Sequence, residues 1–305
     1  MAPARRPFRL AAFIERESVF SWLMLTPPLL FLLAFLGYPF FYGVYLSFFH
    51  REVASVASFV GLSNFVTLSN DPIFWQAVRN TILFTAVATV LKASGGLAMA
   101  LVMNQDFRFK NLTRALLLLP FIVPTVLSTI AWQWILDPAF SVINWALMAT
   151  GLANPGPSWL GNPYLAMFSL IMVNTWRGLP FYAITLLAGL QTISPELYEA
   201  ATIDGASRWQ VFSKVLLPLV SPGILTVAII SGLNIWNEFL ISSTFLQSHD
   251  QQTAVVRFYT LGGQYSSDWG EIMAAAIIIV APAVAFFLLM QRRFIQGMAA
   301  GSVKG

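Results

Sequence analysis

Long apolar stretches constrain this chain of 305 residues more than any other feature. A helix needs roughly 20 mostly apolar residues to cross the hydrocarbon core of a bilayer. The composition agrees, because 57% of the residues are hydrophobic and 10% are charged, whereas soluble domains carry about 25% charged residues. We therefore predict an all-α integral membrane protein with six transmembrane helices. These lie at about residues 21–46, 80–103, 115–136, 164–190, 222–246 and 270–290.

Lysine and arginine residues divide unevenly between the two sides of this topology. Six spans place both termini on one side, which carries twelve of these residues, against three (Arg51, Arg79 and Arg257) on the other. The positive-inside rule makes the richer side the cytoplasm. We expect a cytoplasmic segment over 1–20, a transmembrane domain over 21–290 and a cytoplasmic tail over 291–305. Segment 1–20 suits either a helix on the inner leaflet or a disordered tail. No small-residue cleavage site follows its arginines, which indicates a retained signal anchor.

Several kinds of chemistry are excluded by what the sequence lacks. There is no cysteine, so thiol catalysis, disulfides and thiolate metal sites are impossible. Two histidines are too few for a zinc constellation. No GxxxxGK[ST] loop occurs, so the chain cannot bind ATP in the P-loop manner. We expect no cofactor on this chain, and any ATP-driven work must come from separate subunits.

One polar segment, at about residues 191–221, interrupts the apolar pattern. Ser194 and Pro195 suit an N-cap and first helical position, and Gly205 is expected to break the helix that they begin. A second short helix should follow and end at Leu217-Pro218, because a residue before proline avoids the α region. Two short helices joined by a glycine suit a docking surface better than a span. An ordinary amphipathic connector is the alternative.

The residues of this segment resemble a known family. The sequence Glu-Ala-Ala, then Asp-Gly-Ala, then Val-Leu-Leu-Pro at the family's spacing is similar to the cytoplasmic EAA loop of binding-protein-dependent ABC importers. The resemblance implies a type I importer permease fold with a coupling helix. It also implies that Glu199 contacts an ATPase, that Ala200 and Ala201 keep the contact face small, and that Gly205 forms the turn. The coupling residues carried over are Glu199, Ala200, Ala201, Asp204, Gly205, Leu217 and Pro218.

The resemblance extends over nearly the whole chain. Residues 59–65, Phe-Val-Gly-Leu-Ser-Asn-Phe, are similar to a signature that follows the first span in sugar-importer permeases. The first half looks like the maltose F-type subunit and the end looks like the G-type, so the subfamily stays open. The family implies a carbohydrate-type solute, a second permease in a heterodimer, two ATPase subunits and an extracytoplasmic substrate-binding protein. It also implies location in a bacterial inner membrane.

Two basic residues, Lys92 and Arg177, fall inside predicted spans, where a charge costs about 2.5–3.5 kcal/mol. Lys92 could face an anionic solute, although pairing with a neighbouring helix or carbonyl is favoured. Arg177 lies with Asn174, Gly178 and Pro180 in the fourth span. Glycine and proline within a span often mark a broken helix at a transport site, and an architectural role is equally open.

The fifth span carries a group of polar residues beside a tryptophan. Ser231, Asn234 and Glu238 fall at i, i+3 and i+7, which predicts one shared helix face. Amides bond hydroxyl groups and an indole can stack on a sugar ring, so a substrate pathway is favoured over helix–helix hydrogen bonding. The predicted pathway residues are Ser231, Asn234, Trp236, Asn237, Glu238, Asn174 and Arg177.

Smaller features refine the predicted helices. Gly37-Tyr38-Pro39 should bend the first span, and Pro120 with Pro124 should kink the third. Residues 94–96, Ser-Gly-Gly, predict close packing of the second span. The segment 137–163 has no lysine or arginine and suits either contact with a binding protein or a capping loop.

Two other functional classes fit the residues less well. An ion-coupled secondary carrier would usually bury carboxylates in its spans, and here Glu238 alone does so. An intramembrane enzyme would need a nucleophile–base pair or a metal site. Neither histidine lies inside a predicted span, so this class is the less favoured of the two.

Overall fold

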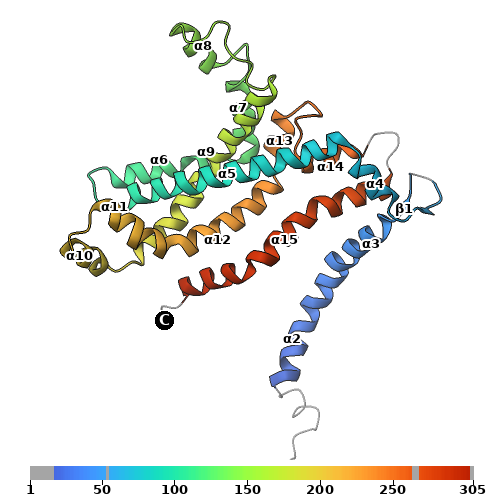
Figure 1. The fold of residues 1–305 in the computed structure, drawn as a ribbon, viewed down its shortest axis with the longest axis horizontal. Helices are drawn as coiled ribbons and strands as arrows, with labels where there is room; N and C mark the ends of the chain where they lie inside the picture. Colours follow the sequence, from blue (N-terminus) through green and yellow to red (C-terminus); the bar gives the residue numbers. More distant parts are fainter. Residues whose placement is uncertain (1–16, 53–54, 263–267, 303–305) are drawn as a thin grey trace, which may run out of the picture. The chain divides into compact units, whose positions relative to one another are not determined.

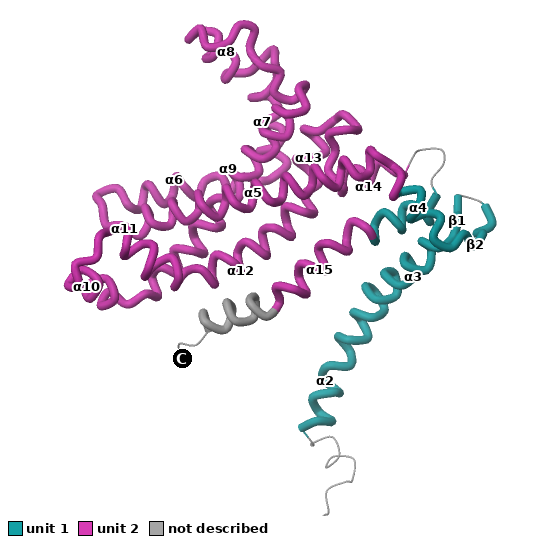
Figure 2. The backbone as a smooth tube through the Cα atoms, in the orientation of Figure 1, with its two compact units in different colours: residues 1–68, 263–277 teal, residues 69–262, 278–305 magenta. Residues whose placement is uncertain are grey.

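The computed structural model describes residues 17–52, 55–262 and 268–302, and in this part of the chain it is mostly helical (Figure 1). The chain divides into two compact units (Figure 2). Unit 1 combines residues 1–68 with 263–277, and unit 2 combines 69–262 with 278–305. The expectations for the N-terminal segment before Glu17 lie outside the described residues.

Unit 1 begins with a helical run of 30 residues, Glu17–Leu46. It comprises α2 (Glu17–Leu32), a π-helical segment η1 (Leu33–Gly37) and α3 (Tyr38–Leu46). The predicted interruption at Gly37-Tyr38-Pro39 takes the form of this π-helical segment, which ends two residues before the proline. Proline has no backbone N–H to donate, and its ring crowds the preceding turn of an α-helix. The wider π-helical turn gives the ring room, so the helix continues.

A short hairpin and helix α4 (Ser63–Ser69) follow α3. Strands β1 (Phe49–His50) and β2 (Ser58–Phe59) pair antiparallel. The side chain of Asn64 donates to the carbonyls of Ser47 at 2.8 Å and Phe49 at 2.9 Å, so it ties α4 to the hairpin. The prediction of an all-α fold missed this pair of two-residue strands, which carries no alternating pattern long enough to read.

Unit 2 is built around α5 (Pro72–Asn104) and α9 (Pro163–Gln191), which pack along each other (Figure 1). A Cβ on Gly95 would lie 2.6 Å from Leu179, and one on Gly96 would lie 3.3 Å from the backbone nitrogen of Ala183. The predicted small-residue face of the second span is thereby confirmed. The remaining helices of unit 2 are α6 (Lys110–Ile122), α7 (Thr125–Ile135), α8 (Val142–Ala149), α10 (Pro195–Ile203), α11 (Arg208–Gln210), π-helical η2 (Val211–Leu216), α12 (Leu217–Trp236), α13 (Leu240–Phe245) and α14 (Ala254–Leu261). Helix α15 (Trp269–Ser302) belongs to unit 1 as far as Ile277 and to unit 2 beyond it.

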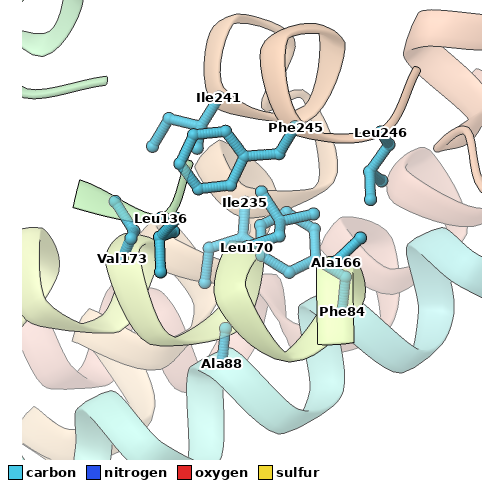
Figure 3. Close-up of a cluster of buried hydrophobic side chains, with 10 residues drawn as sticks. All are labelled: Phe84, Ala88, Leu136, Ala166, Leu170, Val173, Ile235, Ile241, Phe245 and Leu246. Atoms are coloured by element: carbon cyan, nitrogen blue, oxygen red, sulfur yellow. The ribbon is translucent and has the colours of Figure 1, made fainter. Parts of the chain in front are cut away.

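A buried apolar cluster holds the middle of unit 2 together. Figure 3 shows side chains from α5, α9, α12 and α13 converging on it, with Leu136 from the end of α7. In a membrane these side chains would otherwise meet lipid tails, so they hold the helices together by close van der Waals packing and not by transfer from water. The cluster consists of Phe84, Ala88, Leu136, Ala166, Leu170, Val173, Ile235, Ile241, Phe245 and Leu246.

The helices fit the predicted spans in part. Among the described residues four helical runs are long and apolar enough to cross a membrane, or five if α6 and α7 count as one broken span. The two halves of that pair meet at 93°, a far sharper break than the predicted kink at Pro120 and Pro124. The predicted fourth span forms helix α9 but is not among the four. Helix α15 continues past residue 290 to Ser302, so its C-terminal boundary lies beyond the predicted one.

Candidate functional site

Helix α10 carries the Glu-Ala-Ala sequence, and it is capped by a serine side chain at its N-terminus and by backbone hydrogen bonds at its C-terminus. Ser194 is the N-cap and accepts from the N–H of Glu196 at 3.3 Å. At the C-terminus Gly205 has φ +75°, where glycine is favoured. The N–H of Ala206 donates to Ala201 at 2.9 Å and that of Gly205 to Thr202 at 3.1 Å. This is a Schellman motif, so the predicted cap and glycine break are confirmed.

Most side chains of α10 are exposed to the surroundings, while one side of the helix packs against the rest of unit 2. Glu199, Ala200 and Asp204 are exposed, Ala201 is half-buried, and no residue of α10 is buried. Tyr198 and Ile193 pack against a second apolar cluster that includes Leu190 at the end of α9. That cluster also contains Leu216 and Val220. Helix α10 is therefore held to both α9 and α12, the two long helices that flank it in sequence.

The helix after Gly205 does not end where the sequence predicts. Ser207 and Gln210 form a capping box that starts α11. The chain then runs without a break through η2 into α12, as one helical stretch from Arg208 to Trp236. The prediction that Leu217-Pro218 ends this helix is wrong. The π-helical turn, in which the N–H of Leu217 bonds Phe212, makes room for a proline in the first turn of α12.

Polar side chains from three elements meet inside unit 2. Lys92 of α5 is 5% exposed, and its Nζ donates to Oδ1 of Asn174 on α9 at 2.6 Å. Its side chain lies over Gly178, where a Cβ would come 2.7 Å from Nζ. The favoured interpretation of Lys92, pairing with a neighbouring helix, is confirmed. Arg177 lies one turn from Asn174, and its Nε is buried without a hydrogen-bond partner among the described residues.

Glu238 completes this group from a break between α12 and α13. Its carboxylate has the opposite charge to Lys92 and Arg177 and attracts both from beyond ion-pair distance. It also accepts from the N–H of Ile241 at 2.7 Å and from the N–H and hydroxyl of Ser242. Helix α12 ends at Trp236, so the predicted shared face of Ser231, Asn234 and Glu238 is wrong at Glu238. The Glu238 side chain accepts from N–H groups in the first turn of α13, and this bonding favours starting a new helix over continuing α12.

The other predicted pathway residues are not in this group. Asn234 and Asn237 are exposed, and their amides donate to Ile230 and Leu233 of their own helix. Trp236 donates from Nε1 to the carbonyl of Ile279 at 3.2 Å. Ser231 is buried. The sequence reasoning missed Ser242, whose hydroxyl bonds Glu238, because serine within an apolar run carries no distinguishing signal.

An ionic contact in unit 1 joins the hairpin to the start of α15. Nδ1 of His50 lies 2.5 Å from Asp268, which also accepts from the N–H groups of Arg51 and Gly270. The hydrogen bond and charge of Asp268 raise the pKa of His50. Burial opposes ionisation of Asp268, but hydrogen bonds from Arg51, His50 and Gly270 outweigh it and lower the pKa of that carboxyl.

Comparison with known proteins extends these observations. A family described as binding-protein-dependent transport system inner membrane component matches residues 92–300. The trehalose/maltose transport system permease protein MalF of Thermococcus litoralis is 36% identical, covering 70% of this chain and 72% of that protein. The lactose transport system permease protein LacF of Rhizobium radiobacter is 33% identical, covering 71% of this chain and 72% of that one.

A solved structure is also similar over almost the full length. It is described as a bacterial alginate ABC transporter in complex with an alginate pentasaccharide-bound periplasmic protein. The match has a TM-score of 0.78 at 26% identity and covers 94% of this chain and 98% of that chain. With the apolar helices, these similarities identify a multi-pass membrane protein. The chain belongs to the family of inner membrane components of binding-protein-dependent transport systems, the permease subunits of ABC transporters.

Proposed function

We propose that this chain is a translocation subunit of an ATP-driven importer for a carbohydrate-type solute: a sugar, oligosaccharide or polyol derivative. Support comes from relatives whose names specify trehalose/maltose, lactose and diacetylchitobiose uptake, and from the alginate transporter structure. A substrate-binding protein delivers the solute from outside. A second permease completes the path, and two separate ATPase subunits bind and hydrolyse ATP.

In this proposal the chain crosses the inner membrane six times, with both termini in the cytoplasm. The four long apolar helices, the bent pair α6–α7 and the 29-residue helix α9 supply the six spans. Helix α9 at about 1.5 Å per residue is long enough to cross about 30 Å of hydrocarbon. Its less apolar sequence is consistent with a position inside the subunit, where Asn174 accepts from Lys92 and Arg177 is half-buried.

The observation that best supports the proposed mechanism is the packing of α10 against the ends of α9 and α12. Its exposed surface offers Glu199, Ala200 and Asp204 to a partner, with Gly205 at the turn. Its inner edge is fixed through Tyr198 to the ends of α9 and α12. A force applied to α10 by a moving ATPase is therefore passed directly to two long helices. We assign Glu199, Ala200, Ala201, Asp204, Gly205, Leu217 and Pro218 to this coupling function.

The polar group near the α12–α13 break, in which Lys92 and Asn174 are buried and Arg177 and Glu238 are half-buried, is our candidate for the solute pathway. Broken helices in transporters place helix ends and polar side chains near the transported solute. Asn174, Arg177 and Glu238 lie there together with Lys92. Roles of Ser231, Asn234, Trp236 and Asn237 in transport remain predictions. Asn234→Ala is expected to weaken uptake while leaving assembly intact.

An uptake assay in cells tests the proposed function. Accumulation of labelled di- and oligosaccharides is measured for the natural chain and for Glu199→Lys, with membrane insertion checked by immunoblotting. The matched control is Glu196→Lys, which makes the same charge change on the same helix. We expect Glu199→Lys to abolish uptake at normal protein levels and Glu196→Lys to retain most of it. Normal uptake in the Glu199 variant would refute the coupling role.

A further inference from the structure

The most exposed large apolar side chain of segment 191–221 belongs to Ile203, the last residue of α10. It is 85% exposed and is absent from the apolar cluster that anchors α10. Isoleucine is also a weaker helix former than alanine, so helix propensity does not explain its presence here. Neither packing within the described residues nor local structure accounts for this side chain.

Ile203 lies on the side of α10 opposite the anchor. At about 100° per residue it is about 140° around the helix from Tyr198, which packs against the rest of unit 2. Glu199 lies one turn earlier on the same side as Ile203, and both side chains are exposed. The surface that α10 offers to a partner therefore combines an aliphatic side chain with a carboxylate.

The charges around Ile203 indicate what kind of partner covers it. Helix α10 and its C-cap carry Glu196, Glu199 and Asp204 and no basic residue. None of these carboxylates has an ion-pair or hydrogen-bond partner in residues 17–52, 55–262 and 268–302.

Two possible partners fit this acidic surface poorly. The anionic inner leaflet of a membrane attracts basic segments and repels acidic ones. A second copy of the chain, meeting the first across a two-fold axis, would place like charges opposite each other. A different protein with basic residues around an apolar pocket complements both the charge and the exposed isoleucine.

We infer that Ile203 is the apolar anchor of the coupling surface, and that the ATPase subunit receives it in an apolar pocket bordered by basic residues. The basic residues pair with Glu199 and Asp204, which lie on either side of Ile203 in the sequence. Glu196 lies about 10 Å further along the helix and falls outside this pocket. The inference rests on the proposed function, and it adds a contact residue and the chemistry of the partner's pocket.

A fluorescent label at this position shows what covers it, because the chain has no cysteine of its own. Bimane is attached through Ile203→Cys, and in a control through Leu197→Cys, about 120° around the same helix. The chain and its second permease, with any cysteines of the partner subunits replaced, are reconstituted in vesicles of phosphatidylcholine and phosphatidylglycerol. The ATPase that copurifies with the natural chain is removed with urea and then added back.

Addition of the ATPase should shift the emission of the label at position 203 to shorter wavelength and reduce its quenching by acrylamide severalfold. The label at position 197 should change little. A label at position 203 that is already protected before the ATPase is added would overturn the proposal, because lipid or another permease chain then covers it.

The affinity of the same ATPase for the reconstituted variants tests the anchor role. Ile203→Ala should raise the dissociation constant roughly 30-fold or more, as truncation of an interface anchor does. Leu197→Ala should change it by less than about threefold. Alanine favours the helix, so α10 is retained in both variants. Equal affinity of the natural chain and Ile203→Ala would refute the anchor role.

Two further comparisons test the chemistry of the pocket. Ile203→Val and Ile203→Thr differ mainly in a hydroxyl group, so an apolar pocket should bind the threonine variant severalfold more weakly; equal affinities contradict an apolar pocket. The affinity of the natural chain should fall as salt rises, and Glu199→Gln should reduce this dependence. An affinity that does not respond to salt contradicts the basic border.

These measurements separate failure of the inference from failure of the proposed function. If no ATPase copurifies with the natural chain, the proposed function fails. If the ATPase binds the natural chain and Ile203→Ala equally well, the proposed function stands and the inference about Ile203 is wrong.

Discussion

Nζ of Lys92 and Oδ1 of Asn174 lie 2.6 Å apart on neighbouring helices, in a position where Lys92 is 5% exposed. A buried ammonium thus meets a neutral amide instead of directly pairing with a carboxylate. The charge is balanced from farther away by Glu238, at the break between α12 and α13. Lys92 therefore joins α5 to α9 directly, and the helix break acts on it only through the charge of Glu238.

Removing the two partners separately and together tests this contact. Asn174→Leu leaves the buried ammonium without its acceptor and is expected to destabilise the protein by about 3 kcal/mol. Lys92→Met removes both the charge and its desolvation cost and should cost much less. The double variant is expected to be nearly as stable as Lys92→Met. Unfolding in detergent, followed by circular dichroism, measures the cycle; equal and additive losses would show that the contact has no energetic role.

The close packing of α5 on α9 gives a second prediction. A Cβ at Gly96 meets the backbone of Tyr182 and Ala183, which cannot move aside as a flexible side chain can. Gly96→Ala should therefore destabilise the protein by about 1–3 kcal/mol. Gly223→Ala is the matched control, since nothing lies within 4 Å of its Cβ position, and alanine favours a helix by about 0.5–1 kcal/mol. A Gly96 variant as stable as the Gly223 variant would contradict the packing.

The contact between His50 and Asp268 predicts a pH dependence in unit 1. The raised pKa of His50 means that its contribution is complete below about pH 6.5 and is lost as pH rises through the raised value. The lowered pKa of Asp268 means that its contribution is complete above about pH 4 and is lost as pH falls. The hairpin should be held to α15 most firmly between these limits.

Hydrogen exchange of the peptide containing Gly270 measures this effect, because its N–H donates to Asp268. Protection, corrected for intrinsic exchange, is expected to be greater at pH 6 than at pH 9. His50→Gln should abolish the difference, whereas protection around the Asp71–Arg257 ion pair serves as an internal control. The same protection at both pH values in the natural chain would disprove the role assigned to His50.

Local sequence signals predicted much of the fold because each depends on few residues. Ser194 with Pro195 marked the start of α10, and Gly205 its end, since capping needs only nearby backbone and side chain groups. Apolar length predicted the long helices. The glycine pair before Leu97 predicted close packing of the second span, because two adjacent residues without side chains have a clear packing use in a span; that α9 is the partner helix is seen only in the structure.

The sequence predictions were wrong at helix boundaries that depend on unusual backbone geometry or on side-chain hydrogen bonds. Pro218 normally signals a helix end, but the π-helical turn η2 absorbs it. The break before α13 depends on Glu238 turning to cap the next helix, a choice that helical periodicity does not contain. The 93° turn between α6 and α7 likewise comes from the extended backbone of two residues, Val123 (ψ 127°) and Pro124 (ψ 136°), whereas proline alone indicates a kink of unspecified size.

The most direct test of the central claim is affinity purification of the tagged chain from native membranes in mild detergent, followed by mass spectrometry. The natural chain should bring a P-loop ATPase and a second permease. Gly205→Asp forces an acidic side chain into φ +75° at the coupling turn and should lose the ATPase while keeping the second permease; Gly223→Ala should keep both. Recovery of this chain alone, even after crosslinking, would contradict the account, as would equal recovery of the ATPase with Gly205→Asp.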